Sequence, residues 1–209
     1  SSTVRSLADE SFDFVYDAVK PDVRLSAITG RTDLIGCFAQ GAPILPVWRG
    51  ELQCLALGMR VEVFDDDGRA VRQEKGELVC TAPFPSMPVG FWRDDDGRRY
   101  HDAYFAKFDN IWCHGDYVEL TEHDGLIVYG RSDAVLNPGG VRIGTAEIYR
   151  QVEQLEEVVE GLVIGQEWDD DTRVVLFVCL REGVELDSSL EAKIRKQIRD
   201  NATPRHVPS

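Results

Sequence analysis

Two arginines and an aspartate near the middle of the chain have the types and spacing to bind a charged ligand. Arg131 and Arg142 lie on either side of a double-glycine loop, Gly139 and Gly140, and Asp116 lies fifteen positions before the first arginine. A guanidinium group stays charged at any working pH and binds phosphate oxygens bidentately. A carboxylate has the lone pairs to accept hydrogen bonds from two hydroxyl groups at once. The set therefore favours a ligand that carries both a phosphate and a sugar.

Each of these residues also has a purely structural interpretation. Asp116 precedes an expected strand over Tyr117–Thr121, where it could simply cap a hairpin turn. Arg131 and Arg142 could form surface ion pairs, which contribute only ~0–1 kcal/mol each. A lone pair of glycines is weak evidence for any ligand.

Several longer strings resemble the adenylate-forming superfamily of acyl-CoA synthetases, luciferases and peptide-synthetase adenylation domains. They are G-D-Y (115–117), Y-G-R-S-D (129–133) and G-G-V-R-I-G-T-A-E-I (139–148). T-G-R-T-D-L-I-G-C-F (29–38) and P-F-P-S-M-P-V-G-F-W (83–92) resemble the acetoacetyl-CoA synthetase subgroup. The likeness occurs in the family's order and spacing, which makes it far more specific than one motif.

The resemblance implies an enzyme that uses ATP, Mg2+ and CoA to convert acetoacetate into acetoacetyl-CoA through an acyl-adenylate. It implies nucleotide-binding roles for Thr32, Asp116, Arg131 and Arg142, with catalytic roles for Thr32 and Arg142. Two alternatives remain open at this point. One is a CoA ligase for another small carboxylic acid, and the other is a non-catalytic nucleotide-binding or docking module.

The same resemblance assigns further roles by position. Asp133 matches a hinge between a large and a small domain, and Asp33 matches a carboxylate that holds Mg2+. Gly139, Gly140 and Arg195 match positions that contact CoA, and the two residues before Thr32 match the acyl pocket. Gly30 stands where acetyl-CoA synthetases carry a tryptophan, which would leave room for a longer acid. Arg31 departs from the glycine of the acetoacetate subgroup.

Bulk properties bound the class of protein. The chain has 209 residues, 43% of them hydrophobic, which is ordinary for a globular protein. Its net charge of -14 opposes nucleic acid as a main partner. We expect no membrane span, because no apolar run approaches ~20 residues. Five unpaired-looking cysteines and the absence of a signal sequence favour a cytoplasmic protein with reduced thiols. The four histidines have no ligand spacing, and His114 is expected to be a packing residue.

Periodicity predicts an α+β fold: a β-rich, barrel-like subdomain followed by a small α+β domain. The resemblance implies that residues 1–132 are the C-terminal part of a large adenylating domain and that 133–209 are a truncated, mobile C-terminal lid domain. Two D-D-D-G strings, 65–68 and 94–97, are expected to form hairpin turns. The expected helices are Leu7–Lys20, Thr145–Leu155 and Ser188–Asn201. The expected strands are Val23–Thr29, Glu51–Leu55, Arg60–Phe64, Gly76–Thr81, Tyr117–Thr121, Leu126–Gly130, Val158–Ile164 and Arg173–Leu180.

Two segments that the superfamily needs do not occur in the sequence. One is a Gly/Ser/Thr-rich phosphate loop that ends in lysine, and the other is a Gly-Lys segment that carries the adenylating lysine. We therefore expect these residues to be the C-terminal third of a longer enzyme, inactive by themselves.

Overall fold

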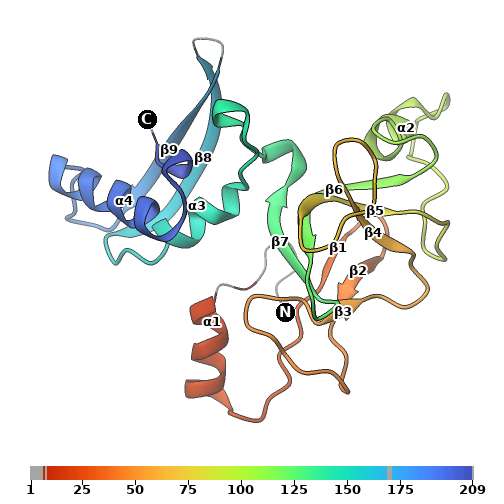
Figure 1. The fold of residues 1–209 in the computed structure, drawn as a ribbon, viewed down its shortest axis with the longest axis horizontal. Coiled ribbons are helices and arrows are strands. Elements are labelled where there is room, and N and C mark those ends of the chain that lie inside the picture. The colour runs from red at the N-terminus through yellow and green to blue at the C-terminus, as the bar shows by residue number, and fades with distance from the viewer. Residues whose placement is uncertain (1–6, 8, 169–170, 209) are drawn as a thin grey trace. The chain divides into compact units, whose positions relative to one another are not determined.

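The computed structural model describes residues 7, 9–168 and 171–208. The chain forms two compact units, Ser1–Tyr129 (unit 1) and Gly130–Ser209 (unit 2), and each is described by itself. Both combine helices and strands, so the predicted α+β class is confirmed (Figure 1). No helix of the described residues is long and apolar enough to cross a membrane. The assignment of the units to a large and a mobile domain stays a prediction.

Unit 1 is built on two sheets whose strands follow one another in chain order. The first contains β1 (Thr29–Arg31), β2 (Gly36–Gln40) and β3 (Cys54–Leu55), paired antiparallel. The second contains β4 (Val61–Phe64), β5 (Lys75–Cys80), β6 (Trp112–Leu120) and β7 (Leu126–Arg131), of which the last two residues are counted in unit 2. The strand orders are linear, so no closed barrel forms among the described residues and the expected β-rich part consists of open sheets.

The core of unit 1 lies between these strands and a cluster of aromatic rings. Phe38, Leu78 and Leu126 are completely buried, and Trp112 is 1% exposed. The ring of Trp112 stacks on Tyr104 with the centroids 3.7 Å apart. Burying large apolar side chains stabilises a fold by ~1.5–3 kcal/mol each, so this cluster fixes the position of β6.

The helices of unit 1 are short. The predicted helix Leu7–Lys20 is present as α1 (Asp9–Phe14) with a π-helical continuation over Val15–Val19. A second helix, α2 (Arg98–Tyr104), was not predicted.

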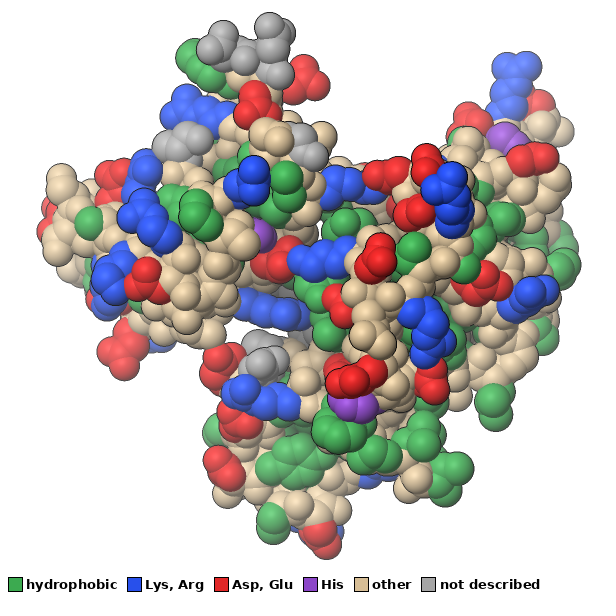
Figure 2. Space-filling model, viewed as in Figure 1, with side chains coloured by type: hydrophobic (Ala, Val, Ile, Leu, Met, Phe, Trp, Pro, Cys, Tyr) green, Lys and Arg blue, Asp and Glu red, His purple; other side chains and the backbone are tan. Residues whose placement is uncertain are grey.

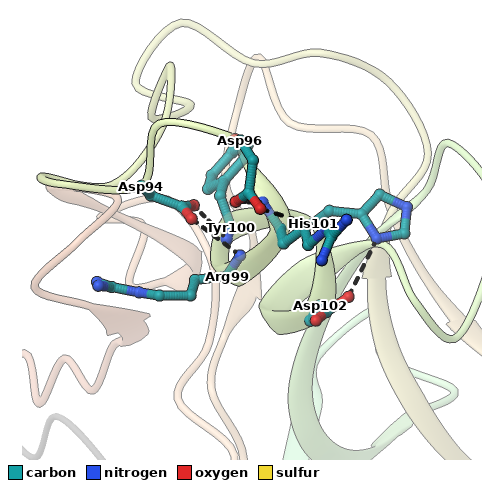
Figure 3. A network of polar contacts seen from close by, with 7 residues as sticks. Asp94, Asp96, Arg99, Tyr100, His101 and Asp102 are labelled. Atoms are coloured by element: carbon teal, nitrogen blue, oxygen red, sulfur yellow. Dashed lines mark hydrogen bonds and ion pairs between the residues drawn. The ribbon is translucent and has the colours of Figure 1, made fainter.

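The D-D-D-G string before α2 caps this helix and does not form the predicted hairpin turn (Figure 3). The carboxylate of Asp94 accepts hydrogen bonds from the backbone N–H groups of Arg99 and Tyr100, at 3.1 and 2.8 Å. These N–H groups have no partner within the helix, and an acidic side chain satisfies them. The other string forms the expected tight turn, in which Asp65 accepts from the N–H of Arg69 at 2.8 Å.

The strand predictions for unit 1 differ from the structure at three places. Residues 23–28 form no strand, and the alternation there ends in the short β1. The strand β2 was not predicted because its residues do not alternate between apolar and polar. Its two buried residues, Phe38 and Ala39, are neighbours in the sequence. β6 also begins five residues earlier than expected, at Trp112.

The loop between β2 and β3 carries an exposed hydrophobic patch. Figure 2 shows hydrophobic side chains gathered in the part of unit 1 where this loop and α1 lie. Ile44 is 90% exposed, and Trp48 stacks on the ring of His123 at 3.8 Å. The buried amide of Gln53 holds the loop by donating to the carbonyl oxygens of Leu45 and Pro46.

Unit 2 packs two helices on a hairpin of two long strands. The strands are β8 (Val158–Trp168) and β9 (Asp171–Leu180), and the helices are α3 (Thr145–Val152) and α4 (Ser188–Asn201). Short 3-10 turns cover Ser132–Ala134, Pro138–Gly140 and Pro204–His206.

The helices of unit 2 follow their predicted apolar spacing. Leu190, Ile194 and Ile198 recur at i, i+4 and i+8 and are all buried, as an amphipathic helix requires. α4 begins where Asp187 accepts a hydrogen bond from the N–H of Leu190 at 2.8 Å. The sequence prediction of Ser188–Asn201 is confirmed at both ends.

Candidate functional site

Asp116 lies inside β6, where the strand bulges, and not in the turn expected before a strand. Glu77 of β5 pairs with Tyr117 and Val79 pairs with Cys113, so β6 has extra residues opposite Leu78. Gly115 provides the bend with a φ of 79°, a conformation that favours glycine. A bulge of this kind re-aims the side chain beside it, and here that side chain is Asp116.

The carboxylate of Asp116 is largely buried and receives two neighbours on one oxygen. The hydroxyl of Thr29 donates to Oδ2 at 3.3 Å, and Nε2 of His114 lies 3.5 Å from the same atom. The Asp116 side chain is 13% exposed and that of His114 is inaccessible. The structure thus joins two motifs that lie 87 positions apart in the chain.

The T-G-R-T-D string forms the tip of the β1–β2 hairpin. Thr32 and Asp33 lie in the turn between the strands, where Thr32 is exposed and Asp33 is half-buried. Gly30 has a structural reason besides pocket size, because a Cβ there would lie 2.2 Å from the carbonyl oxygen of Gly36. The acyl-pocket role of Gly30 and Arg31 stays a prediction.

Charged side chains of this hairpin act on one buried and one half-buried group of unit 1. Burial, followed by the positive charge of Arg31, lowers the pKa of His114 to about 3. Burial, followed by the negative charge of Asp33, raises the pKa of Tyr100. Arg31 therefore lies near the strand that carries Asp116, and Asp33 lies near the aromatic cluster.

The β1–β2 hairpin tip offers a metal ion one protein carboxylate, that of Asp33. Within the described ranges, no three His, Cys, Asp or Glu side chains gather closely enough to enclose an ion. Mg2+ that is held mainly by phosphate oxygens and water needs only one or two carboxylates. Asp33 fits that limited role, as a single ligand.

In unit 2 the predicted hinge lines a cavity. Ser132–Ala134 forms a 3-10 turn, and Nε of Arg131 lies 3.3 Å from Oδ1 of Asp133. Asp133 and Asn137 border a cavity of about 420 Å3 with Val163 and Thr172. Because the wall contains both the turn and the β8–β9 hairpin, a change at the turn would reshape this cavity.

The N-P-G-G loop is tied to the tip of the β8–β9 hairpin. Gly139 has a φ of 59°, and its N–H donates to Oδ1 of Asp171 at 2.8 Å. The loop closes where Leu136 and Ile143 exchange backbone hydrogen bonds of 2.9 Å, which places Arg142 beside the closure. The second glycine, Gly140, ends the 3-10 turn.

The tie to Asp171 predicts an acid-sensitive loop. Hydrogen bonds from the N–H groups of Gly139 and Thr172 lower the pKa of Asp171 below 3.8. A carboxyl group with a lowered pKa stabilises the folded loop above its ordinary pKa, and the contribution is lost as the pH falls through the folded value. The Gly139 amide resonance, followed by NMR from about pH 6 to 2, should therefore shift with a midpoint below 3.8.

The Asp171→Asn variant should abolish this shift. Asp200→Asn, which changes an exposed carboxylate of α4, is the control and should leave the shift unchanged. A Gly139 midpoint at or above 3.8 in the wild type would contradict the tie.

Arg195 lies elsewhere in unit 2. Its Nε is 3.1 Å from Oε1 of Glu191, one turn earlier on α4. Together with Arg173, Leu176 and Ile194 it lines a groove of about 200 Å3 between β9 and α4. Its predicted CoA role stays a prediction, and the ion pair gives it a structural role as well.

The candidate residues therefore fall into two sets. Thr29, His114, Asp116 and the Thr32–Asp33 turn belong to unit 1, whereas Arg131, Asp133 and Arg142 belong to unit 2. Sequence reasoning overlooked Thr29 and assigned His114 only to packing. The signal for His114 was the spacing W-C-H-G-D, which puts Trp112, His114 and Asp116 two positions apart along one strand.

The chain has close relatives of known name, although no protein-family model matches it. It is 60% identical over 209 residues to the acetoacetyl-coenzyme A synthetase of Rhizobium meliloti, covering 100% of this chain and 32% of the relative. The chain is homologous over its whole length to acetoacetyl-CoA synthetases. It spans about a third of the length of the acetoacetyl-CoA synthetases that it matches.

Solved structures agree with this relationship. The acetoacetyl-CoA synthetase of Streptomyces lividans matches with a TM-score of 0.90 and 42% identity, over 99% of this chain and 32% of that one. An anthranilate CoA ligase, solved in complex with anthranoyl-AMP, matches with a TM-score of 0.78 and 20% identity. It covers 99% of this chain and 38% of that one, and at this identity it supports the fold alone. Acetoacetyl-CoA synthetases and other adenylate-forming ligases thus share this chain's fold.

Proposed function

We propose that the chain is part of an ATP-dependent acid–thiol ligase that forms acetoacetyl-CoA. The observation that carries the proposal is the whole-length identity of 60% to an acetoacetyl-CoA synthetase. The largely buried carboxylate of Asp116, beside the T-G-R-T-D hairpin, supports it because two of the strings that resemble the family meet there.

In this proposal the roles that the resemblance implies are assigned residue by residue within each unit. Asp116 accepts hydrogen bonds from the ribose hydroxyls, and Arg131 and Arg142 bind the ribose and phosphate region. Thr32 lies at the hairpin tip, where its exposed hydroxyl can reach the acyl phosphate, and Asp33 beside it can bind one Mg2+. When bound, Mg2+ would neutralise charge on the phosphate oxygens.

The proposed reaction has two steps. A carboxylate oxygen of acetoacetate attacks the α-phosphorus of ATP, which gives acetoacetyl-adenylate and releases pyrophosphate. The sulfur of CoA then attacks the acyl carbon, loses its proton, and AMP leaves. Arg142 would stabilise charge that develops on the phosphate. A hinge rotation of the backbone at Asp133 would let the smaller unit present the 139–140 loop for the second step.

The chain by itself is expected to have no ligase activity, because its sequence has neither the phosphate loop nor the adenylating Gly-Lys segment. Pyrophosphate exchange into ATP should be absent with the 209 residues alone. It should be present with acetoacetate in a polypeptide of the relatives' length that carries them. Turnover by the 209 residues alone would contradict this expectation.

A panel of small carboxylic acids in the same exchange assay distinguishes the alternatives. Exchange with another acid, and none with acetoacetate, would replace the proposed substrate. Binding of AMP without exchange on any acid would support a nucleotide-binding module and overturn the ligase proposal.

A further inference from the structure

His114 is a buried histidine that touches the candidate ribose-binding carboxylate. It is 1% exposed, and its ring packs edge-on against Phe38 with the centroids 4.8 Å apart. Nε2 lies 3.5 Å from Oδ2 of Asp116, and Nδ1 lies 3.5 Å from Nε1 of Trp112. Both ring nitrogens therefore face polar atoms of the same strand.

The contact with Trp112 decides which nitrogen carries the proton. An indole N–H can only donate a hydrogen bond, so Nδ1 of His114 must be the acceptor. A neutral imidazole has one donor and one acceptor, which leaves the proton on Nε2, facing Asp116. Burial and the nearby charge of Arg31 lower the pKa to about 3, and this keeps the ring neutral at ordinary pH.

The Thr29 hydroxyl donates a hydrogen bond to Oδ2 of Asp116, and Nε2 of His114 faces the same oxygen at 3.5 Å in a polar contact that is not a hydrogen bond. At 3.3 and 3.5 Å these contacts are long, so they orient the carboxylate more than they stabilise it. A cation in the same place would cancel the carboxylate's charge, whereas neutral groups preserve it. One hydrogen bond from Thr29 and the adjacent imidazole edge together restrict the plane of the carboxylate for a ligand with two hydroxyl groups.

We propose that His114 is a positioning residue, whose Nε2–H, fixed by Trp112, orients the Asp116 carboxylate to accept the ribose hydroxyls of the nucleotide. This inference rests on the proposed function, because it needs Asp116 to contact ribose. The proton on Nε2 can be checked without any nucleotide.

The binding test compares AMP with 2′,3′-dideoxy-AMP by isothermal titration calorimetry. The dissociation constant of dideoxy-AMP divided by that of AMP measures only what the ribose hydroxyls contribute to binding. His114→Phe keeps an aromatic ring and removes the Nε2–H, and it should reduce this ratio about 5–10-fold, because a misoriented Asp116 carboxylate would accept one ribose hydrogen bond fewer. His114→Gln restores an N–H at the Nε2 position and should recover most of the ratio. His101→Gln, an exposed histidine on α2, is the matched control and should leave the ratio unchanged.

A second measurement reads the ring directly. The 15N shifts of His114 should show the proton on Nε2 and no titration near 6.5, and Trp112→Phe should let both nitrogens share the proton. A wild-type ratio retained by His114→Phe, or a proton found on Nδ1, would overturn the positioning role. Equal binding of AMP and dideoxy-AMP by wild type and Asp116→Asn would instead overturn the proposed ribose site, and the positioning role with it.

Discussion

Replacement of Asp116 by alanine is expected to raise the dissociation constant for AMP about 100-fold. Two ribose hydroxyls donating to one carboxylate would each contribute ~1.5 kcal/mol, which is the lower range for hydrogen bonds to charged groups, and ~3 kcal/mol corresponds to that factor. Calorimetry of AMP binding to the wild type and to Asp116→Ala measures it directly. The loss should disappear with 2′,3′-dideoxy-AMP, because that ligand has no hydroxyls for the carboxylate to accept.

A surface carboxylate provides the control for this variant. Asp67 lies in an exposed turn and pairs with Arg69 at 2.8 Å, so Asp67→Ala changes net charge equally without touching the site. AMP affinity should be unchanged there. If Asp116→Ala binds AMP as tightly as the wild type does, the ribose assignment is wrong, and the resemblance of G-D-Y to the relatives' motif has another cause.

Sequence periodicity predicted unit 2 well because its elements are long and amphipathic. Ser188–Asn201 was placed correctly, and both strands of the hairpin were found, although β8 continues to Trp168 beyond its predicted end at Ile164. The polar residues after Ile164 hid that extension. Cross-strand pairing, such as Gln166 with Arg173, continues the ladder where composition alone gives no signal.

Unit 1 was harder to predict because its features depend on contacts between distant residues. The Asp-Gly string at 94–97 is compatible with a hairpin turn and with a helix start, and its residue types do not distinguish the two. In the structure a helix follows, and Asp94 caps it. The bulge at Gly115 becomes visible only once β5 is placed beside β6. Residue types could suggest Asp116, but the contact with Thr29 needed the fold.

The bulge that aims Asp116 lies opposite Glu77, a buried carboxylate of β5 that pairs with Lys107 in the loop after α2. Glu77 is 2% exposed, and its Oε2 lies 2.9 Å from Nζ of Lys107. Glu77 pairs with Tyr117, at the position where the β5–β6 register shifts. Burial and the Glu77 carboxylate raise the pKa of Cys113 to about 12, so this thiol stays protonated and contacts the carboxylate as a neutral group. Lys107 therefore supplies a positive charge next to Glu77.

Lys107→Met is expected to lower the free energy of unfolding by about 3 kcal/mol. Methionine keeps most of the side-chain volume, but the buried carboxylate loses its cation, and breaking such a pair costs ~3–5 kcal/mol when both groups are buried. Lys107 is 35% exposed, which places the expected value at the lower end. Urea unfolding monitored by tryptophan fluorescence measures it, since three of the four tryptophans are in unit 1.

The double variant Glu77→Gln with Lys107→Met separates the charge from packing. It removes both charges together, so it should recover most of the lost stability, whereas a purely steric loss would persist. Lys196→Met on α4 breaks an exposed pair with Asp200 and should change stability by less than ~1 kcal/mol. A double variant as unstable as Lys107→Met would show that the lysine stem, and not its charge, supports the strand. AMP affinity should fall with the single variant and return with the double, because Glu77 lies on β5 opposite the bulge that orients Asp116.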